Sequence, residues 1–291
     1  MRIANLTATV VCIAAFLLVP TMLLAQGKGE KKQVAITFDE LPAAQAFEEV
    51  HPDAINYLIL EALKRHQVKA AGFVVGNRIE GNLDILGQWL QGGHLLGSMT
   101  FDNEDLHNVT PDQFKKEIVE GADELEPMLD GFGQQKRYFR FPFLHYGVTK
   151  KDKQAMRDFL GSHRQIIAHA TIVPEDFTYN NVLGGLGRIP DSTRLLRLRD
   201  EYFNHLLDLV DRQEQLAQKL ADRAVRQILL LRANRLNAIF LDELLTALEE
   251  QGYSFIMLDA ALRDDIYARA DNYTGSRGAG YLEMLAAGKK K

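Results

Sequence analysis

Short apolar runs alternate with longer amphipathic segments from residue 33 to residue 258. The runs are rich in β-forming residues, which predicts buried strands, and the segments between them carry apolar residues at helical spacing. Strands that alternate with helices predict a parallel sheet. The number of such units favours an α/β fold of the (β/α) barrel type, distorted or incomplete, over an open doubly wound sheet. The expected strands are Gln33–Phe38, Ala70–Val75, His94–Ser98, Tyr138–Phe141, Gln165–Ile172, Ile228–Leu231 and Ser254–Leu258.

Local start and stop residues bound the expected helices. A predicted helix runs from Thr110 to about Leu129, with Thr110 as its N-terminal cap and Pro111 in its first turn. The longest helical stretch, 193–225, predicts one long helix or a bent pair, packed on its own barrel or on a partner. The other expected helices are Asp53–His66, Leu83–Gln91, Lys150–His163 and Asn237–Gln251.

The N-terminus predicts a secretory signal peptide. Arg2 precedes an almost wholly apolar run from Val10 to Leu24, and the small residue Ala25 follows at a plausible cleavage point. An uncut membrane anchor is the alternative, although the run is short for a full span. We therefore expect an exported, periplasmic or extracellular protein that contacts a membrane only if this segment is uncleaved.

The sequence also predicts how the chain is divided into segments. A flexible lead (26–32) follows the signal peptide (1–25), the main domain covers 33–262, and 263–291 form a C-terminal extension. Cys12 is the one cysteine and lies in the signal peptide, so the mature chain has no thiol for a disulfide or a metal. The formal net charge of -5 argues against nucleic-acid binding.

Polar residues collect where the predicted strands end, and in (β/α) barrels chemistry occurs at the carboxyl ends of the strands. Two adjacent carboxylates, Asp39 and Glu40, end the first strand and suit a general base beside a metal ligand. The same pair could instead cap a helix and face solvent. Three further segments follow strand ends: Gly93–Leu106, Arg140–His145 and Leu229–Asn234.

These segments, in this order, resemble the polysaccharide deacetylases, the NodB homology group of carbohydrate esterase family 4. The resemblance runs from about Val34 to Leu262, and the run from Ile228 to Tyr253 is similar to one exported bacterial subgroup. Each motif is short, and the ordered set is what is specific. The resemblance implies a metal-dependent hydrolase that removes acetyl groups from a glycan, such as a chitin-like oligomer or peptidoglycan.

Several site positions of the family are retained. The resemblance implies that Asp39 is the catalytic base and that Arg140 orients it. Pro142 and Phe143 match the rest of that motif, next to the substrate. Asp176 matches the acid of the fourth motif, and Phe177 replaces a tryptophan of the sugar groove.

Other site positions are substituted. Glu40 replaces a metal-binding aspartate, and Met99 and Asn103 replace the two metal-binding histidines. Neither a thioether nor a neutral amide is a good zinc ligand. Arg232 replaces the general-acid histidine, and a guanidinium cannot cycle a proton, but it can pair with Asp176. We therefore expect an Asp176–Arg232 ion pair and no bound cofactor.

Three histidines lie close enough in sequence to be considered as replacement metal ligands. His94 is expected to begin a strand, His107 to face solvent, and His145 to belong to a stretch that the subgroup shares. A substitute zinc site is therefore not expected.

The substitutions fall where the chemistry would occur, which predicts a catalytically degenerate, sugar-binding or scaffolding protein of the cell envelope. Two alternatives stay open. One is an active metal-dependent deacetylase, with Asp39, Glu40, Asp102 and Asn103 around magnesium, calcium or manganese. The other is a structural or partner-binding protein that has lost the sugar groove.

Overall fold

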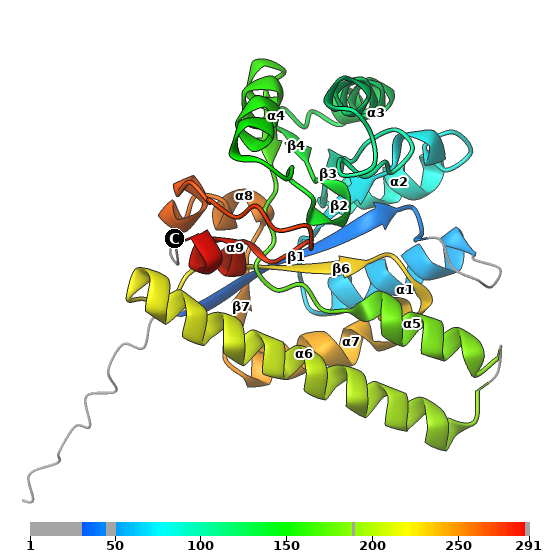
Figure 1. The fold of residues 1–291 in the computed structure, drawn as a ribbon. Helices are drawn as coiled ribbons and strands as arrows, with labels where there is room; N and C mark the ends of the chain where they lie inside the picture. Colours follow the sequence, from blue (N-terminus) through cyan, green and yellow to red (C-terminus); the bar gives the residue numbers. More distant parts are fainter. Residues whose placement is uncertain (1–30, 45–50, 188–189, 289–291) are drawn as a thin grey trace, which may run out of the picture.

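The structure is a computed structural model that describes residues 31–44, 51–187 and 190–288 (Figure 1). The predicted signal peptide and most of the predicted lead lie outside these ranges. Within them, no helix is both long enough and apolar enough to cross a membrane.

A curled parallel sheet forms the centre of the molecule, with helices around it (Figure 1). The strand order is β5-β4-β3-β2-β1-β6, and β7 pairs with the start of β1. The predicted (β/α) barrel of incomplete type is therefore confirmed. The strands are β1 (Lys32–Leu41), β2 (Ala71–Val74), β3 (Leu95–Ser98), β4 (Arg137–Phe139), β5 (Gln165–Ile167), β6 (Gln227–Arg232) and β7 (Tyr253–Phe255).

The segment after β5 spans the open side of the sheet. Ile172 forms a parallel bridge with Leu229 of β6, and the Leu230 N–H donates to the Ile172 carbonyl at 2.9 Å. The run predicted as one strand, Gln165–Ile172, is therefore divided. Its first residues pair with β4 and its last with β6, because the chain must cross from one edge of the sheet to the other.

The predicted helices occur in the predicted order, and three further helices are present among the described residues. The capping box predicted by Thr110 is present at α3, where Thr110 and Gln113 bond reciprocally. The 193–225 stretch forms a single helix, α6, which ends at Ala221 and packs on α5 and α9 of the same chain (Figure 1). None of α5, α8 and α9 was predicted. The helices are α1 (Pro52–Arg65), α2 (Leu83–Gln91), α3 (Pro111–Gly131), α4 (Lys150–Ser162), α5 (Asp176–Gly185), α6 (Ser192–Ala221), α7 (Arg235–Glu250), α8 (Leu258–Ala261) and α9 (Tyr281–Gly288), with 3-10 turns η1 (Gly76–Arg78), η2 (Pro142–Leu144) and η3 (Asp265–Ala268).

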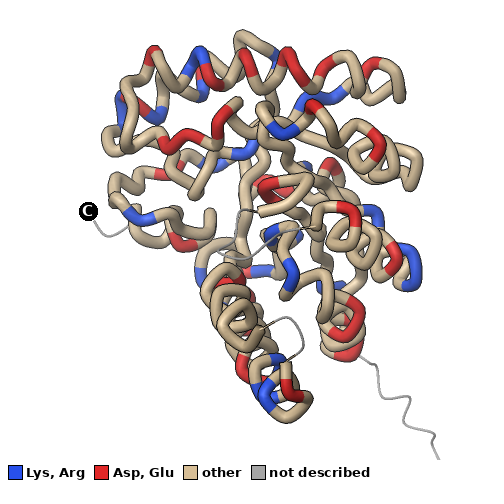
Figure 2. Tube along the Cα trace, turned by 90° about the vertical axis from the view of Figure 1, so that its right-hand side faces the viewer, with Lys and Arg blue, Asp and Glu red and all other residues tan. Residues whose placement is uncertain are grey.

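The predicted C-terminal extension packs into the core. Ile266, Tyr281 and Leu282 are buried in a cluster that also contains residues of β2, β4 and β6. His169 stacks on the ring of Tyr281, and burial lowers the pKa of His169 to about 3, so the imidazole is neutral at pH 7. Charges of both signs are interspersed over the outer helices (Figure 2).

Candidate active site at the carboxyl ends of the strands

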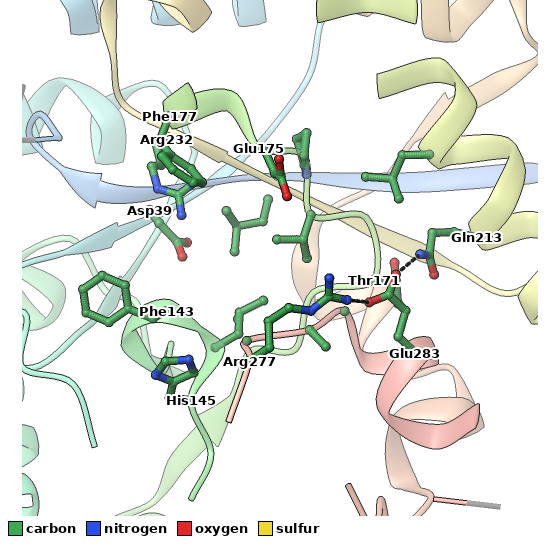
Figure 3. Close-up of a pocket in the computed structure, with 18 of the residues that line it drawn as sticks. Asp39, Phe143, His145, Thr171, Glu175, Phe177, Gln213, Arg232, Arg277 and Glu283 are labelled. Carbon is green, nitrogen blue, oxygen red and sulfur yellow. Dashed lines mark hydrogen bonds and ion pairs between the residues drawn. The ribbon is translucent and has the colours of Figure 1, made fainter. Parts of the chain in front are cut away.

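A cavity of about 430 Å³ opens where the strands end (Figure 3). Because the strands are parallel, their carboxyl ends meet at this one end of the sheet. Figure 3 shows Asp39 between Arg232 and Phe177 on one side and Phe143 and His145 on the other. Residues from the ends of β1 and β6, from the loops after β3 and β4, from α6 and from the C-terminal segment contribute to its wall.

The residues singled out from the sequence come together here. The predicted contact residues at the cavity wall are Asp39, Glu40, Met99, Asn103, Phe143, Phe177 and Arg232. Arg140, Pro142 and Asp176 are buried and do not line the cavity. Arg140 contacts Asp39, and Asp176 contacts Arg232. The arrangement brings the predicted residues to one place, while their roles remain predictions.

The backbone at the cavity is strained. Glu40, Asn103, Phe143 and Leu144 all have positive φ angles, between 55° and 65°. A residue with a side chain in this region costs about 1–3 kcal/mol, and such strain tends to occur at functional sites. The strain therefore supports a functional role for the cavity.

Asp39 and Arg140 form the predicted contact. Arg140 is fully buried, and its Nη1 lies 3.8 Å from Asp39 Oδ1, while its Nη2 donates to Thr37 Oγ1 at 3.1 Å. At 3.8 Å the two charges attract but do not form a good hydrogen bond. Burial raises the pKa of Asp39 to about 6, against the opposing effects of Arg140 and Arg232. This carboxyl therefore changes charge near neutral pH.

Arg232 lies between two carboxylates. Its Nη1 donates to Asp176 Oδ1 at 2.5 Å, and its Nε donates to Glu40 Oε1 at 3.2 Å. Burial by itself would lower the pKa of Arg232, but Asp176 and Glu40 outweigh it and the net effect is a rise. The expected Asp176–Arg232 ion pair is present. The contact with Glu40 was not foreseen.

Asp176 is held by a buried network. It is the first residue of α5, is fully buried, and accepts from the Arg232 backbone N–H at 2.7 Å. Asn237 Nδ2 of α7 donates to the same carboxylate at 2.6 Å. Sequence reasoning missed Asn237, because an asparagine three residues after the helix cap Asn234 carries no distinctive pattern.

The residues at the family's metal positions do not fit a zinc ion. Glu40 is already engaged by the guanidinium of Arg232, and a fixed positive charge at 3.2 Å opposes a second cation there. Met99 contributes a buried, neutral thioether, which is a poor zinc ligand. Asn103 Oδ1 is buried and has no hydrogen-bond partner among the described residues.

The alternative metal site with oxygen ligands lacks one of its four proposed ligands. Asp102 is exposed, does not line the cavity, and accepts from Asn77 Nδ2 at 2.7 Å. The expectation that Asp102 joins Asp39, Glu40 and Asn103 around one ion is therefore wrong. The left-handed turn at Asn103 separates the two neighbouring side chains.

The three histidines have different environments. His94 accepts from the Ala70 N–H at 3.1 Å, and burial lowers its pKa to about 4, which makes it a structural residue. The expectation that His107 faces solvent is wrong, because His107 is half-buried and stacks on His145 with 3.9 Å between ring centroids. His145 lines the cavity, and its Nδ1 lies 2.7 Å from Asp105 Oδ1.

The C-terminal segment forms one wall of the cavity. Arg277 pairs with Glu283 at 3.4 Å, and Gln213 donates to Glu283 at 3.3 Å (Figure 3). A Cβ on Gly278 would lie 1.9 Å from the Phe143 carbonyl oxygen, so the segment approaches the η2 loop closely. Sequence reasoning missed this wall, although closely spaced glycines can indicate a close backbone approach.

Residues 26–161 match the family model for polysaccharide deacetylase. Over these residues the chain belongs to the polysaccharide deacetylase family. The match covers the segments that carry Asp39, Met99, Asn103 and Arg140, while Asp176 and Arg232 lie beyond it.

Two relatives of this chain carry the names of peptidoglycan deacetylases. It is 28% identical over 117 residues to the peptidoglycan-N-acetylglucosamine deacetylase of Bacillus cereus, covering 40% of this chain and 38% of that protein. It is 24% identical over 236 residues to the peptidoglycan-N-acetylmuramic acid deacetylase PdaA of Bacillus subtilis, covering 80% of this chain and 72% of that protein.

Among solved structures, the fold matches BA3943 of Bacillus anthracis, described as a CE4 family pseudoenzyme. The TM-score is 0.55 at 18% identity, covering 80% of this chain and 66% of that chain. At this identity the likeness shows a shared fold.

Proposed function

We propose that this chain is a catalytically degenerate polysaccharide deacetylase that binds an acetylated glycan of the cell envelope without hydrolysing it. The observation that carries the proposal is the guanidinium of Arg232, which pairs with both Glu40 and Asp176. These two contacts put a permanent cation where the family has a metal ligand and a proton-cycling acid.

The chemistry of the substituted groups supports this reading. Arginine stays protonated at all working pH values, so Arg232 cannot protonate a leaving group and then recover the proton. Loss of the metal removes both the activation of water and the polarisation of the carbonyl, each worth several kcal/mol of the barrier. Asp39 and Arg140 keep their contact, but a base alone does not supply these terms.

The cavity retains features that suit a sugar. Phe143 and Phe177 expose 50% and 47% of their surface, and both line the cavity. Aromatic faces bind the apolar faces of sugar rings, and the surrounding carboxylates and amides can bond hydroxyl groups. The names of the two peptidoglycan deacetylase relatives favour peptidoglycan as the acetylated glycan. The predicted signal peptide supports export to the compartment where peptidoglycan lies.

Two measurements on the same protein test the proposal. Calorimetry with N-acetylglucosamine oligomers and with peptidoglycan fragments should detect binding that persists in a chelator. An assay for released acetate should give no signal above buffer, with and without added zinc, cobalt or manganese. Acetate release that chelator abolishes would show an active enzyme, and no binding of either glycan would favour a structural or partner-binding protein.

A further inference from the structure

Asp105, His107 and His145 form a cluster at the rim of the cavity. Asp105 and His107 come from the loop after β3, and His145 follows η2 after β4. One possible ligand atom from each residue lies within 4.8 Å of the other two. Because His145 also lines the cavity, the cluster is continuous with the candidate site.

His107 has an imidazole nitrogen that the described part of the chain leaves without a partner. Its Nε2 is buried and neither donates to nor accepts from any described residue. A buried imidazole nitrogen without a hydrogen-bond partner is available as a metal ligand.

Asp105 already orients both of the other residues. Its Oδ1 accepts from the His107 backbone N–H at 2.8 Å and lies 2.7 Å from His145 Nδ1. The nearby cations have carboxylate partners of their own, since Lys153 pairs with Asp271 and Arg277 pairs with Glu283. Lys153 and Arg277 therefore do not place an unpaired positive charge beside the cluster, where it would oppose binding of a cation.

We propose that Asp105, His107 and His145 bind one divalent transition-metal ion of the zinc and cobalt class. Two imidazoles and one carboxylate are a frequent ligand set for such ions, and they leave a coordination position open. The site is separate from Glu40, Met99 and Asn103, and it does not depend on the proposed glycan binding. It would join the loop after β3 to the loop after β4.

The ring geometry defines what binding requires. The planes of His107 and His145 are 9° apart, and one ion cannot lie on the lone pairs of two parallel rings at this spacing. One imidazole must turn about its Cβ–Cγ bond, a torsion that is broad for histidine. The ion then replaces the hydrogen bond between His145 and Asp105.

The test uses the full chain without a polyhistidine tag, stripped with chelator and titrated with Co²⁺ and then Zn²⁺. Visible absorption of Co²⁺ reports the ligand geometry, and calorimetry gives the stoichiometry. The variants are Asp105→Asn, His107→Gln and His145→Gln. The matched controls are His163→Gln, an exposed histidine at the end of α4, and the double variant Met99→Ala/Asn103→Ala.

We expect one equivalent of metal in the unaltered chain and in both controls. Each of the three variants should weaken binding by more than the roughly 10–100-fold typical of losing an outer-shell partner. Far-UV circular dichroism checks that each variant folds, and zinc should raise the unfolding temperature of the unaltered chain but not that of the variants.

Three outcomes would overturn the proposal. They are an unaltered chain with no stoichiometric metal, binding that survives in all three folded variants, and binding lost in the Met99/Asn103 control. None of these measurements uses a glycan, so they are independent of the test of the proposed function.

Discussion

Arg232 and Asp176 are joined twice, once through the side chain and once through the backbone. The guanidinium Nη1 and the backbone N–H of Arg232 donate to the two carboxylate oxygens of Asp176, at 2.5 Å and 2.7 Å. Asp176 is fully buried, so its charge depends on these donors and on Asn237. The register of β1 and β6 also sets Arg232 opposite Asp39. A fixed cation is thereby built into the centre of the candidate site.

Arg232→Ala should destabilise the fold. The substitution leaves Asp176 buried without its charged partner, which for a buried pair costs about 3–5 kcal/mol of unfolding free energy. Denaturant unfolding measures the change. Arg199→Ala is the control. Arg199 of α6 forms a partly exposed ion pair with Glu243 of α7, and its loss should leave the unfolding midpoint nearly unchanged. A midpoint for Arg232→Ala equal to that of the control would contradict the structural role of the pair.

Zinc binding at the family position should return only when Arg232 is also replaced. We expect Met99→His/Asn103→His alone to bind zinc weakly, because the guanidinium still engages Glu40. Adding Glu40→Asp and Arg232→His removes the fixed cation and should give a stoichiometric site. Both combinations are best made with His107→Gln and His145→Gln, which removes the second proposed site from the calorimetry. Equal affinity of the two combinations would show that Arg232 does not oppose the metal.

The unfolding free energy of the protein should depend on pH through the titration of Asp39. Burial raises the pKa of Asp39 from 3.8 to about 6, so between these values the folded state binds a proton that the unfolded chain has released. The contribution of Asp39 to the unfolding free energy therefore falls as pH rises through this window, by about 3 kcal/mol in total. The difference between the unaltered chain and Asp39→Asn should slope downward with rising pH there and level off above the folded pKa. A flat difference curve would mean that Asp39 titrates normally.

Phe143→Ala and Phe177→Ala should each weaken glycan binding. Both rings are about half exposed and line the cavity, and losing an aromatic contact of this kind costs about 0.5–1.5 kcal/mol, roughly 2–10-fold in Kd. Phe132→Ala is the matched control, because Phe132 is 47% exposed but caps α3 outside the cavity. Calorimetry with the glycan that binds the unaltered chain gives the comparison. Similar losses in all three variants would argue that the cavity is not the binding site.

Gly278→Ala should disturb both stability and the cavity wall. The new Cβ would lie 1.9 Å from the Phe143 carbonyl oxygen, so either the C-terminal segment or the η2 loop must move, at about 1–3 kcal/mol. Gly161→Ala is the control, since a Cβ in that helix meets no atom within 4 Å and should be neutral or slightly stabilising. Thermal unfolding and glycan calorimetry would follow both variants. If Gly278→Ala behaved like Gly161→Ala, the close packing of this wall would not be needed.

Local patterns predicted much of the fold. Strand runs such as Ile228–Leu231 and helix signals such as Thr110-Pro111 act over a few residues, so they can be read without knowing the rest of the chain. The α5 helix was missed because it begins at Asp176, whose buried partners come from β6 and α7. The strand predicted over Gln165–Ile172 was divided because its two halves pair with opposite edges of the sheet. Both departures arise from contacts between residues far apart in sequence.

Sequence patterns were sufficient to predict the alternation of strands and helices, the end of the sheet at which polar residues gather, and the site positions that differ from the family. Parallel strands bring their carboxyl ends together whatever the details of packing, so the assembly of Asp39, Met99, Asn103 and Arg232 was predictable. The directions of the side chains depend on long-range packing in the folded chain. It turned Glu40 toward Arg232, set Asp102 away from the cavity, and stacked His107 on His145. These outcomes depend on left-handed turns and on burial against distant segments, which local sequence patterns do not encode.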